Sequence, residues 1–290
     1  MSKKILITGA AGYIGGALAQ RFYSRGDTVR GLVRLPEQVA QLEHLGMQAV
    51  LGTLDETPKL EQHAAWADVI INAADYEDAV AVSSFLHCLK GSGKSFVQLS
   101  GSSVASVVSD ELDPHIFTED SVCPRPGKAH LHAINQQCIA AAADDIRSIV
   151  IVPGLIYGPA ALKQAGFFAA WAAWAKECGF VPYLGKAENS WSNVHLDDLV
   201  DLFVLAIENA APGSLFFAEN GEATLFSMAQ QLQAQLKLPL PAQALPLQTF
   251  IDKWGESTTA TIFGGNSRIS ALRARTQLHW APRHTIETSP

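Results

Sequence analysis

Three glycines near the start of the chain, Gly9, Gly12 and Gly15, have a spacing that suits the binding of an anion. Gly9 permits a tight turn, Gly12 lets the backbone approach phosphate oxygens, and Gly15 lets the following helix pack closely on the preceding strand. The free N–H groups of such a turn and the N-terminus of the helix attract negative charge. The spacing therefore predicts a site for the pyrophosphate of a nucleotide.

The residues on either side of the glycines support this prediction. The apolar run 5–7 indicates a buried strand before the turn, and residues 17–22 continue with helical character after it. An ordinary strand-to-helix turn is the alternative, because glycine triplets are common. The strand before the glycines and the helix after them favour a dinucleotide site over an ordinary turn. The residues of the turn expected at the cofactor are Gly9, Ala11, Gly12, Tyr13, Ile14 and Gly15.

The residue that would discriminate NAD from NADP is expected at the end of the second strand, roughly 20 residues after the glycines. Sites for NAD usually place Asp or Glu there, whereas this chain has Val33 and Arg34. The planar guanidinium of Arg34 suits a 2′-phosphate. Arg30, on the same predicted strand, would add positive potential. A surface arginine on an edge strand is the alternative, and it suits Arg30 better than Arg34. The sequence therefore favours NADP, with NAD as the alternative.

Strand-like and helical segments alternate along the first half of the chain, with strands expected at 5–8, 28–33, 48–51, 69–73, 96–100 and 149–152. This alternation predicts an α/β fold with a doubly wound parallel sheet and helices on both faces. Ligands of such sheets bind beyond the carboxyl ends of the strands.

The pattern weakens after Pro153, where apolar helices, Pro and Gly breaks and isolated strand-like pieces such as 214–217 follow. This change predicts a smaller carboxyl-terminal lobe that binds the substrate. Residues 1–153 plus about 190–211 are expected to form the NAD(P)-binding domain. Residues from about 154 to 189 plus 212–290 are expected to form the smaller substrate-binding lobe.

Composition narrows the class of protein further. The 290 residues are 48% hydrophobic and carry a formal net charge of −7, which fits a soluble globular protein and argues against nucleic-acid binding. The apolar stretch 167–175 is shorter than the about 20 residues that a membrane span needs. No export leader precedes the first strand, and the four cysteines lack the spacing of metal ligands. We therefore expect a cytoplasmic protein without a metal, a membrane or a nucleic-acid partner.

Five blocks of sequence follow one another in a recognisable order: 8–15, 67–74, 153–159, 193–199 and 267–282. Together they resemble the extended short-chain dehydrogenase/reductase family, also called the NAD-dependent epimerase/dehydratase family. The resemblance covers nearly the whole chain and implies a Rossmann-type fold, a dinucleotide cofactor, a small-molecule substrate and a homodimer formed through paired helices. The further residues expected at the cofactor are Ala73, Ala74, Ser100, Pro153 and Leu155.

The catalytic residues of that family are missing at their usual places. Its members use a Tyr-x-x-x-Lys pair, in which the Tyr moves a proton and the Lys lowers its pKa, and a Ser or Thr that holds the substrate oxygen. No Tyr lies between the predicted fifth and sixth strands. Counting back from Pro153 puts the Tyr position near Lys128 and the Lys position near His132. The hydroxyl position falls on Gly101, which Ser100, Ser102 and Ser103 flank.

The candidate catalytic residues are therefore His132, Lys128, His130 and Ser102. An imidazole has an ordinary pKa of about 6.5, which suits proton transfer near neutrality. Lys128 lies four residues before His132 and would hold it neutral by charge repulsion. A solvated first turn of a helix, with both histidines in water, is the alternative.

The leading hypothesis is an NADP-binding oxidoreductase of the epimerase/dehydratase type, acting as a reductase of a small organic substrate. A non-catalytic NADP-binding sensor or regulatory protein is the alternative, because Tyr, Lys and Ser are all replaced. A sugar-nucleotide epimerase is a weaker alternative, since that reaction relies on the Tyr.

Overall fold

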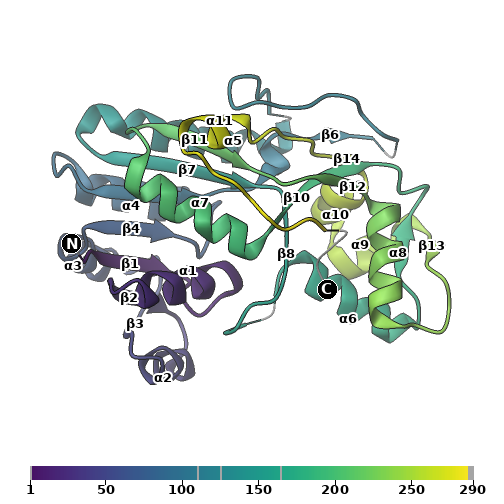
Figure 1. Ribbon diagram of the computed structural model, residues 1–290, viewed down its shortest axis with the longest axis horizontal. Helices are drawn as coiled ribbons and strands as arrows, with labels where there is room; N and C mark the ends of the chain where they lie inside the picture. The colour runs from purple at the N-terminus through teal and green to yellow at the C-terminus, as the bar shows by residue number, and fades with distance from the viewer. Residues whose placement is uncertain (1, 110, 125, 164, 287–290) are drawn as a thin grey trace.

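The computed structural model describes residues 2–109, 111–124, 126–163 and 165–286. Its centre is a sheet of seven strands in the order β11-β7-β5-β4-β1-β2-β3, and every neighbouring pair is parallel (Figure 1). The strands are β1 (Lys4–Thr8), β2 (Thr28–Val33), β3 (Gln48–Leu51), β4 (Val69–Asn72), β5 (Ser95–Leu99), β7 (Arg147–Pro153) and β11 (Ser214–Ala218). The predicted Rossmann-type α/β fold is confirmed.

Helices cover both faces of this sheet because its strands are apolar on both sides. In β1, Ile5 and Ile7 belong to one hydrophobic core and Leu6 to the other. The first core also contains side chains of α1 (Tyr13–Ser24), α2 (Pro36–His44) and α7 (Leu196–Asn209). The second contains side chains of α3 (Thr57–Trp66), α4 (Ala79–Leu89) and α5 (Ala129–Ala140). The strands are thereby held with their carboxyl ends at one edge.

Strand β11 corrects one sequence-based expectation. Residues 214–217 were expected as an isolated piece of the smaller lobe, but β11 pairs in parallel with β7, from Ser214 beside Ile149 to Ala218 beside Pro153. The physical reason is burial on both faces of the sheet. Phe216 packs in the first core, whereas Leu215 and Phe217 pack in the second.

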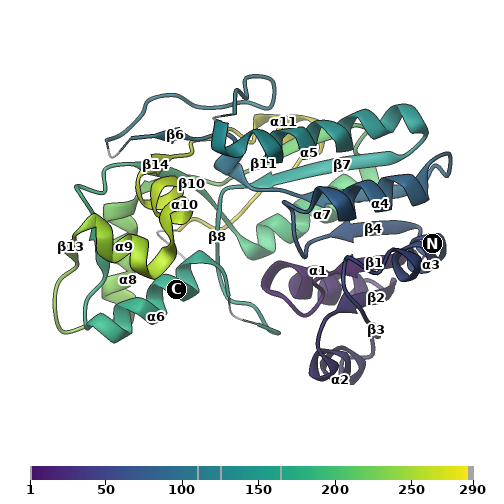
Figure 2. The same cartoon turned by 180° about the vertical axis from the view of Figure 1, so that it is seen from behind.

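The smaller lobe has a separate hydrophobic core that contains Trp171, Trp191, Phe250 and Phe263. Its helices are α6 (Phe167–Cys178), α8 (Leu225–Leu236), α9 (Leu247–Trp254) and α10 (Glu256–Thr258). Its strands are β8 (Leu155–Tyr157), β10 (Ser190–His195) and β12 (Glu222–Thr224) in one small sheet and β9 (Pro182–Leu184) and β13 (Gln243–Leu245) in another. Figure 2 shows this lobe beside one end of the central sheet.

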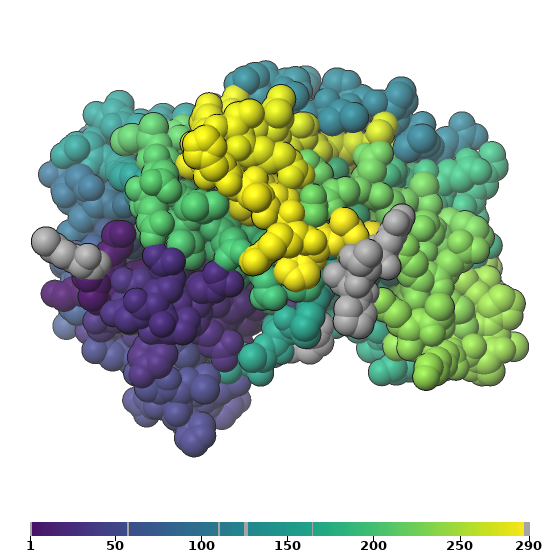
Figure 3. All heavy atoms as spheres, viewed as in Figure 1, coloured from purple at the N-terminus to yellow at the C-terminus, as the bar shows by residue number. Residues whose placement is uncertain are grey.

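The remaining elements join the two parts. Strands β6 (Val107–Val108) and β14 (Gly265–Asn266) pair antiparallel, and α11 (Leu272–Gln277) leads into the carboxyl-terminal segment. This segment lies over α7, as the space-filling view shows in yellow over green (Figure 3). The indole N–H of Trp280 donates to the carbonyl oxygen of Asp198 at 2.9 Å. None of the helices in the described part of the chain has the length and apolarity that a membrane span requires.

Candidate functional site

The turn between β1 and α1 has the geometry that the glycine spacing predicts. Gly9 has a φ of +67°, and a Cβ there would lie 2.9 Å from the Cα of Ala74. A Cβ on Gly15 would lie 2.2 Å from the carbonyl oxygen of Gly9. No side chain caps α1 at Gly12, and its first turn contains no acidic residue. Its first N–H groups, which have no partner within the helix, are available to an anion.

A cavity of about 500 Å³ opens beside this turn, and we call it the nucleotide cavity. It lies at the carboxyl ends of β1, β2 and β4, where a doubly wound sheet binds ligands. The residues predicted at the cofactor that line it are Gly9, Ala11, Gly12, Arg34, Ala73 and Ala74. Lys163, which sequence reasoning did not identify, lines it as well.

The two arginines of the β2 region face different surroundings. Arg34 lines the nucleotide cavity. The guanidinium of Arg30 lies 3.7 Å from the ring centroid of Trp66 and donates to Oε1 of Gln48. Arg30 is therefore not a lining residue, because a cation–π contact and a hydrogen bond hold its guanidinium away from the cavity.

Three carboxylates also line the nucleotide cavity: Asp55, Asp75 and Asp78. Two of them have local partners. Oδ1 of Asp78 accepts from the N–H of Ala81 and caps α4, and Oδ1 of Asp75 accepts from the N–H of Glu77. These bonds fix the loop after β4.

A second cavity of about 280 Å³ lies at the carboxyl ends of β5 and β7, and we call it the inner cavity. Neighbouring residues of the chain line the two cavities: Gly12 lines the nucleotide cavity, and Tyr13 lines the inner cavity. The structure brings to it the predicted residues Tyr13, Ile14, Ser100, Ser102, Lys128, Pro153 and Leu155. The hydroxyl oxygen of Ser100 is buried and has no hydrogen-bond partner among the described residues.

The four candidate catalytic residues do not all reach the cavities. Lys128 lines the inner cavity with a side chain that is 12% exposed, and its Nζ lies 3.0 Å from Oε1 of Glu77. Nε2 of His130 lies 3.2 Å from Oε2 of Glu77. Neither His130 nor His132 lines either cavity. The ammonium group of Lys128 is thus paired with Glu77, so the expected repulsion of His132 lacks structural support.

Tyr76 lines the inner cavity, although sequence reasoning did not select it. Its hydroxyl oxygen lies 3.5 Å from the position that a Cβ on Gly101 would take. Burial raises the pKa of Tyr76, and the nearby charges of Glu77 and Asp75 raise it further. The available signal was a phenol just beyond the carboxyl end of β4, where ligands of this fold are expected.

Buried polar bonds connect the turn with the loop that carries Tyr76. The hydroxyl of Thr8 donates to Oδ1 of Asn72 at 2.7 Å and accepts from the N–H groups of Ala73 and Ala74. Nδ2 of Asn72 donates to Oε1 of Gln98 at 3.0 Å. Nε2 of Gln98 in turn donates to the carbonyl oxygen of Tyr76 at 3.4 Å. This network fixes the backbone on which both cavities depend.

A separate contact joins α1 to the smaller lobe. The hydroxyl of Tyr13 donates to the carbonyl oxygen of Gly158 at 2.6 Å. Burial raises the pKa of Tyr13, and Asp197 raises it further, so the phenol remains a donor at neutral pH. A Cβ on Gly158 would lie 2.4 Å from Nε2 of His195, so only glycine fits this close approach.

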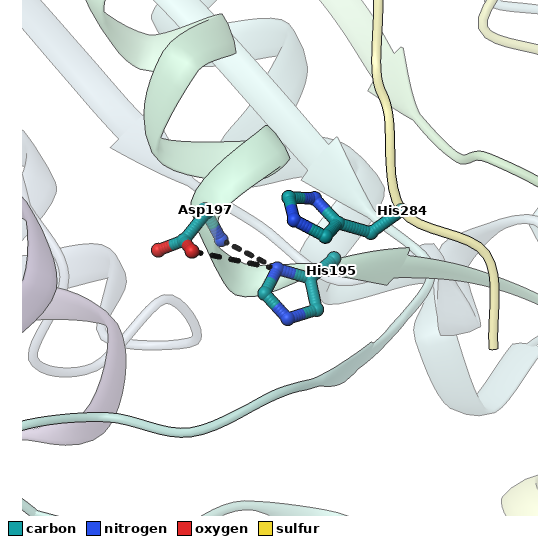
Figure 4. Close-up of side chains that lie close together, drawn as sticks. All are labelled: His195, Asp197 and His284. Atoms are coloured by element: carbon teal, nitrogen blue, oxygen red, sulfur yellow. Dashed lines mark hydrogen bonds and ion pairs between the residues drawn. The ribbon is translucent and has the colours of Figure 1, made fainter. Parts of the chain in front are cut away.

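His195, Asp197 and His284 lie together beside that contact (Figure 4), with potential ligand atoms within 4.8 Å of one another. The two imidazole rings stack with centroids 4.0 Å apart and planes 22° apart. Histidine binds a metal in the ring plane at about 2 Å, and planes so nearly parallel do not meet at that distance. Nδ1 of His195 accepts from the N–H of Asp197, and Nδ1 of His284 lies 3.0 Å from Oδ1 of Asp198. The cluster holds the carboxyl-terminal segment on α7.

The sheet order, the glycine turn and the cavities at the strand ends define a Rossmann-type α/β protein. Residues 5–216 match the model of the NAD dependent epimerase/dehydratase family, and the chain belongs to this family. The members and neighbours of the family named below are enzymes.

Three comparisons indicate the range of its relatives. The chain is 27% identical to an oxidase of an Acremonium species, over 97% of this chain and 93% of that one. It is 26% identical to a 3-diazoavenalumate denitrifying reductase of a Streptomyces species, over 97% and 96%. A dTDP-glucose 4,6-dehydratase of Bacillus anthracis in complex with NAD superposes with a TM-score of 0.79 at 18% identity, over 99% and 94%. The last comparison supports the fold alone.

Proposed function

We propose that the protein binds NADPH across the two cavities and reduces a carbonyl group of a small organic substrate. The observation that carries this proposal is that neighbouring residues of the chain line the two cavities. Gly12 and Ala74 line the nucleotide cavity, and Tyr13 and Tyr76, one or two residues further on, line the inner cavity with Lys128. A dinucleotide could occupy both cavities, with its pyrophosphate at the glycine turn and its nicotinamide in the inner cavity.

The residues present fit this cofactor. Gly9 and Gly15 leave space at the turn that a Cβ would fill, and the uncapped first turn of α1 offers N–H groups to a pyrophosphate. Arg34 and Lys163 would hold the 2′-phosphate that distinguishes NADP from NAD. The unpartnered hydroxyl of Ser100 is available to the nicotinamide end. When bound, the reduced nicotinamide supplies the hydride.

The lining of the inner cavity favours a substrate with an apolar body. Phe167, Trp191 and Ile262 supply apolar surface from the smaller lobe, while Ser102 and Thr261 add polar groups. Such a lining is typical of sites for small organic molecules, where a few polar groups set the orientation. The Acremonium and Streptomyces relatives are an oxidase and a reductase, which supports a redox reaction.

The test is a titration followed by a substrate screen. The purified protein is titrated with NADPH and NADH, using nucleotide fluorescence, and then supplied with NADPH and a panel of aldehydes, ketones, enones and quinones while absorbance at 340 nm is followed. Substrate-dependent NADPH consumption supports the proposal. Tight NADPH binding without turnover across the panel would instead favour the sensor, and interconversion of UDP-sugars without net NADPH consumption would favour the epimerase.

A further inference from the structure

We propose that Tyr76 is the proton donor of the reductase, supplied by the loop after β4 in place of the absent tyrosine of α5. This inference rests on the proposed reductase function. Tyr76 is the residue at which three independent observations meet: its place in the cavity, the space that Gly101 leaves for it, and the bonds that hold its backbone.

The position of the phenol is set by the end of β5. A Cβ on Gly101 would be 3.5 Å from Cε2, Cζ and the hydroxyl oxygen of Tyr76, so a side chain longer than alanine would compete with the phenol for this space. The hydroxyl therefore lies where the resemblance placed a serine or threonine. Ser100 and Ser102, on either side of Gly101, line the same cavity.

The loop that carries Tyr76 is tied on three sides. Its carbonyl oxygen accepts from Gln98, and the following N–H, that of Glu77, donates to Oδ1 of Asp75 at 2.9 Å. The carboxylate of Glu77 bonds to Nζ of Lys128 at 3.0 Å, which connects the loop to the start of α5. A donor held by several bonds keeps the geometry that proton transfer requires.

The surroundings of Tyr76 suit a donor more than a base. The charged groups near it are Glu77 and Asp75 on its own loop, and Lys128, the residue before α5, lines the same cavity. Burial and the two carboxylates raise the pKa of the phenol, which keeps its proton in place at neutral pH. The ammonium group of Lys128 pairs with Glu77 and so offsets one of these two negative charges.

The proton step balances with the hydride step. As a hydride reaches the carbonyl carbon, the electron pair of the C=O π bond moves to the oxygen. The O–H bond of Tyr76 breaks and a new O–H bond forms on that oxygen, which yields the alcohol. The phenolate of Tyr76 then takes a proton from solvent.

The decisive variant is Tyr76→Phe, which keeps the ring and removes only the hydroxyl. We expect its Kd for NADPH to stay within about twofold of the wild type and its kcat to fall at least about 100-fold, the usual effect of losing a general acid. Tyr183→Phe is the matched control, because Tyr183 packs on Phe226 outside both cavities and should leave kcat unchanged.

A second readout does not depend on turnover. The chain has five tyrosines, so protein labelled with 3-fluorotyrosine should give five ¹⁹F resonances, and the one lost in Tyr76→Phe is assigned to Tyr76. Addition of NADP⁺ should shift this resonance and leave that of Tyr183 in place.

The outcomes separate the two proposals. If wild type reduces a substrate and Tyr76→Phe does so equally fast, or if bound NADP⁺ leaves the Tyr76 resonance unmoved, Tyr76 is not the donor and the reductase proposal stands. If wild type turns over no substrate, the reductase proposal fails and the donor proposal fails with it.

Discussion

The hydroxyl of Thr8, at the end of β1, donates a 2.7 Å hydrogen bond to Oδ1 of Asn72, at the end of β4. The same oxygen accepts from the N–H groups of Ala73 and Ala74, which begin the loop between the two cavities. One buried side chain thus sets the separation of the glycine turn and the loop that carries Tyr76. This relationship makes the position of Thr8 testable.

Thr8→Val replaces the hydroxyl with a methyl group of similar size and leaves Asn72 and two amides without this partner. We expect the free energy of unfolding to fall by about 2–4 kcal/mol and the affinity for NADPH to fall with it, as measured by urea denaturation and fluorescence titration. Thr28→Val, at the exposed start of β2, is the control and should change stability by less than about 0.5 kcal/mol. Equal stability of the two variants would refute the role of Thr8.

Arg34→Ala tests the preference for NADP. We expect about 10- to 100-fold weaker NADPH binding, which corresponds to the loss of about 1.5–3 kcal/mol of charge-assisted hydrogen bonding, and little change for NADH. Arg30→Ala removes the same charge four residues earlier, at a position that contacts Trp66 rather than the cavity. It should leave NADPH affinity unchanged. Similar losses in both variants would mean that Arg34 acts only through net charge.

Gly15→Ala tests the close packing of the turn. Its Cβ would lie 2.2 Å from the backbone oxygen of Gly9, so the turn has to move. The first N–H groups of α1 would then no longer point at the pyrophosphate. We expect the Kd for NADPH to rise at least about tenfold, on the scale of 1.4 kcal/mol for each factor of ten. At Gly16 the nearest contact is the flexible side chain of Leu162, so Gly16→Ala should bind nearly as well as wild type. A Gly15→Ala protein with unchanged affinity would contradict the geometry of the turn.

The stability of the protein should fall as the pH drops below about 6.5, in part through His195. Burial lowers the pKa of His195, and the adjacent His284 lowers it further, against the opposing effect of Asp197 and Asp198. The unfolded chain, with a histidine pKa of about 6.5, therefore takes up the proton first, and unfolding becomes easier as pH falls from that value toward the lower folded one.

Replacement of this imidazole should flatten that dependence. His195→Asn keeps a side chain that can cap α7, so urea denaturation at pH 7.5, 6.5 and 5.5 should give a shallower loss of stability than the wild type. His44→Asn, at the exposed end of α2, shows whether the loss of any imidazole has the same effect. If the stability of His195→Asn falls with pH as steeply as that of the wild type, His195 does not cause the pH dependence.

The fold was predictable because each of its signals is local. The glycine turn at residues 9–15 and the apolar runs of β1 and β4 depend on neighbouring residues, and the structure has them as the sequence indicates. Strand β11 was misplaced because its apolar run has the same pattern whether it joins the central sheet or the lobe. Its pairing with β7 depends on contacts far apart in the sequence.

The inner cavity was harder to predict for a related reason. Lys128 and Ser102 were found by counting along the chain from Pro153 and β5, and both line the cavity. Tyr76 was missed because the resemblance places the tyrosine of the family between β5 and β7, whereas Tyr76 follows β4 and reaches the end of β5 only in the folded chain. The contact of Arg30 with Trp66 was not predictable, because Trp66 comes from α3 and the pattern of β2 contains no sign of it.

The transfer of label from NADPH to product tests the central claim of hydride transfer most directly. NADPH carrying deuterium at C4 of the nicotinamide, prepared separately in each of the two stereochemical forms, is incubated with the protein and a carbonyl substrate, and the alcohol is analysed by mass spectrometry. We predict that one of the two forms adds one mass unit to the alcohol, on the former carbonyl carbon, and that the other adds none. Bound NADPH that transfers no deuterium to any substrate of the panel would contradict the reductase and identify the site as one that only holds the nucleotide.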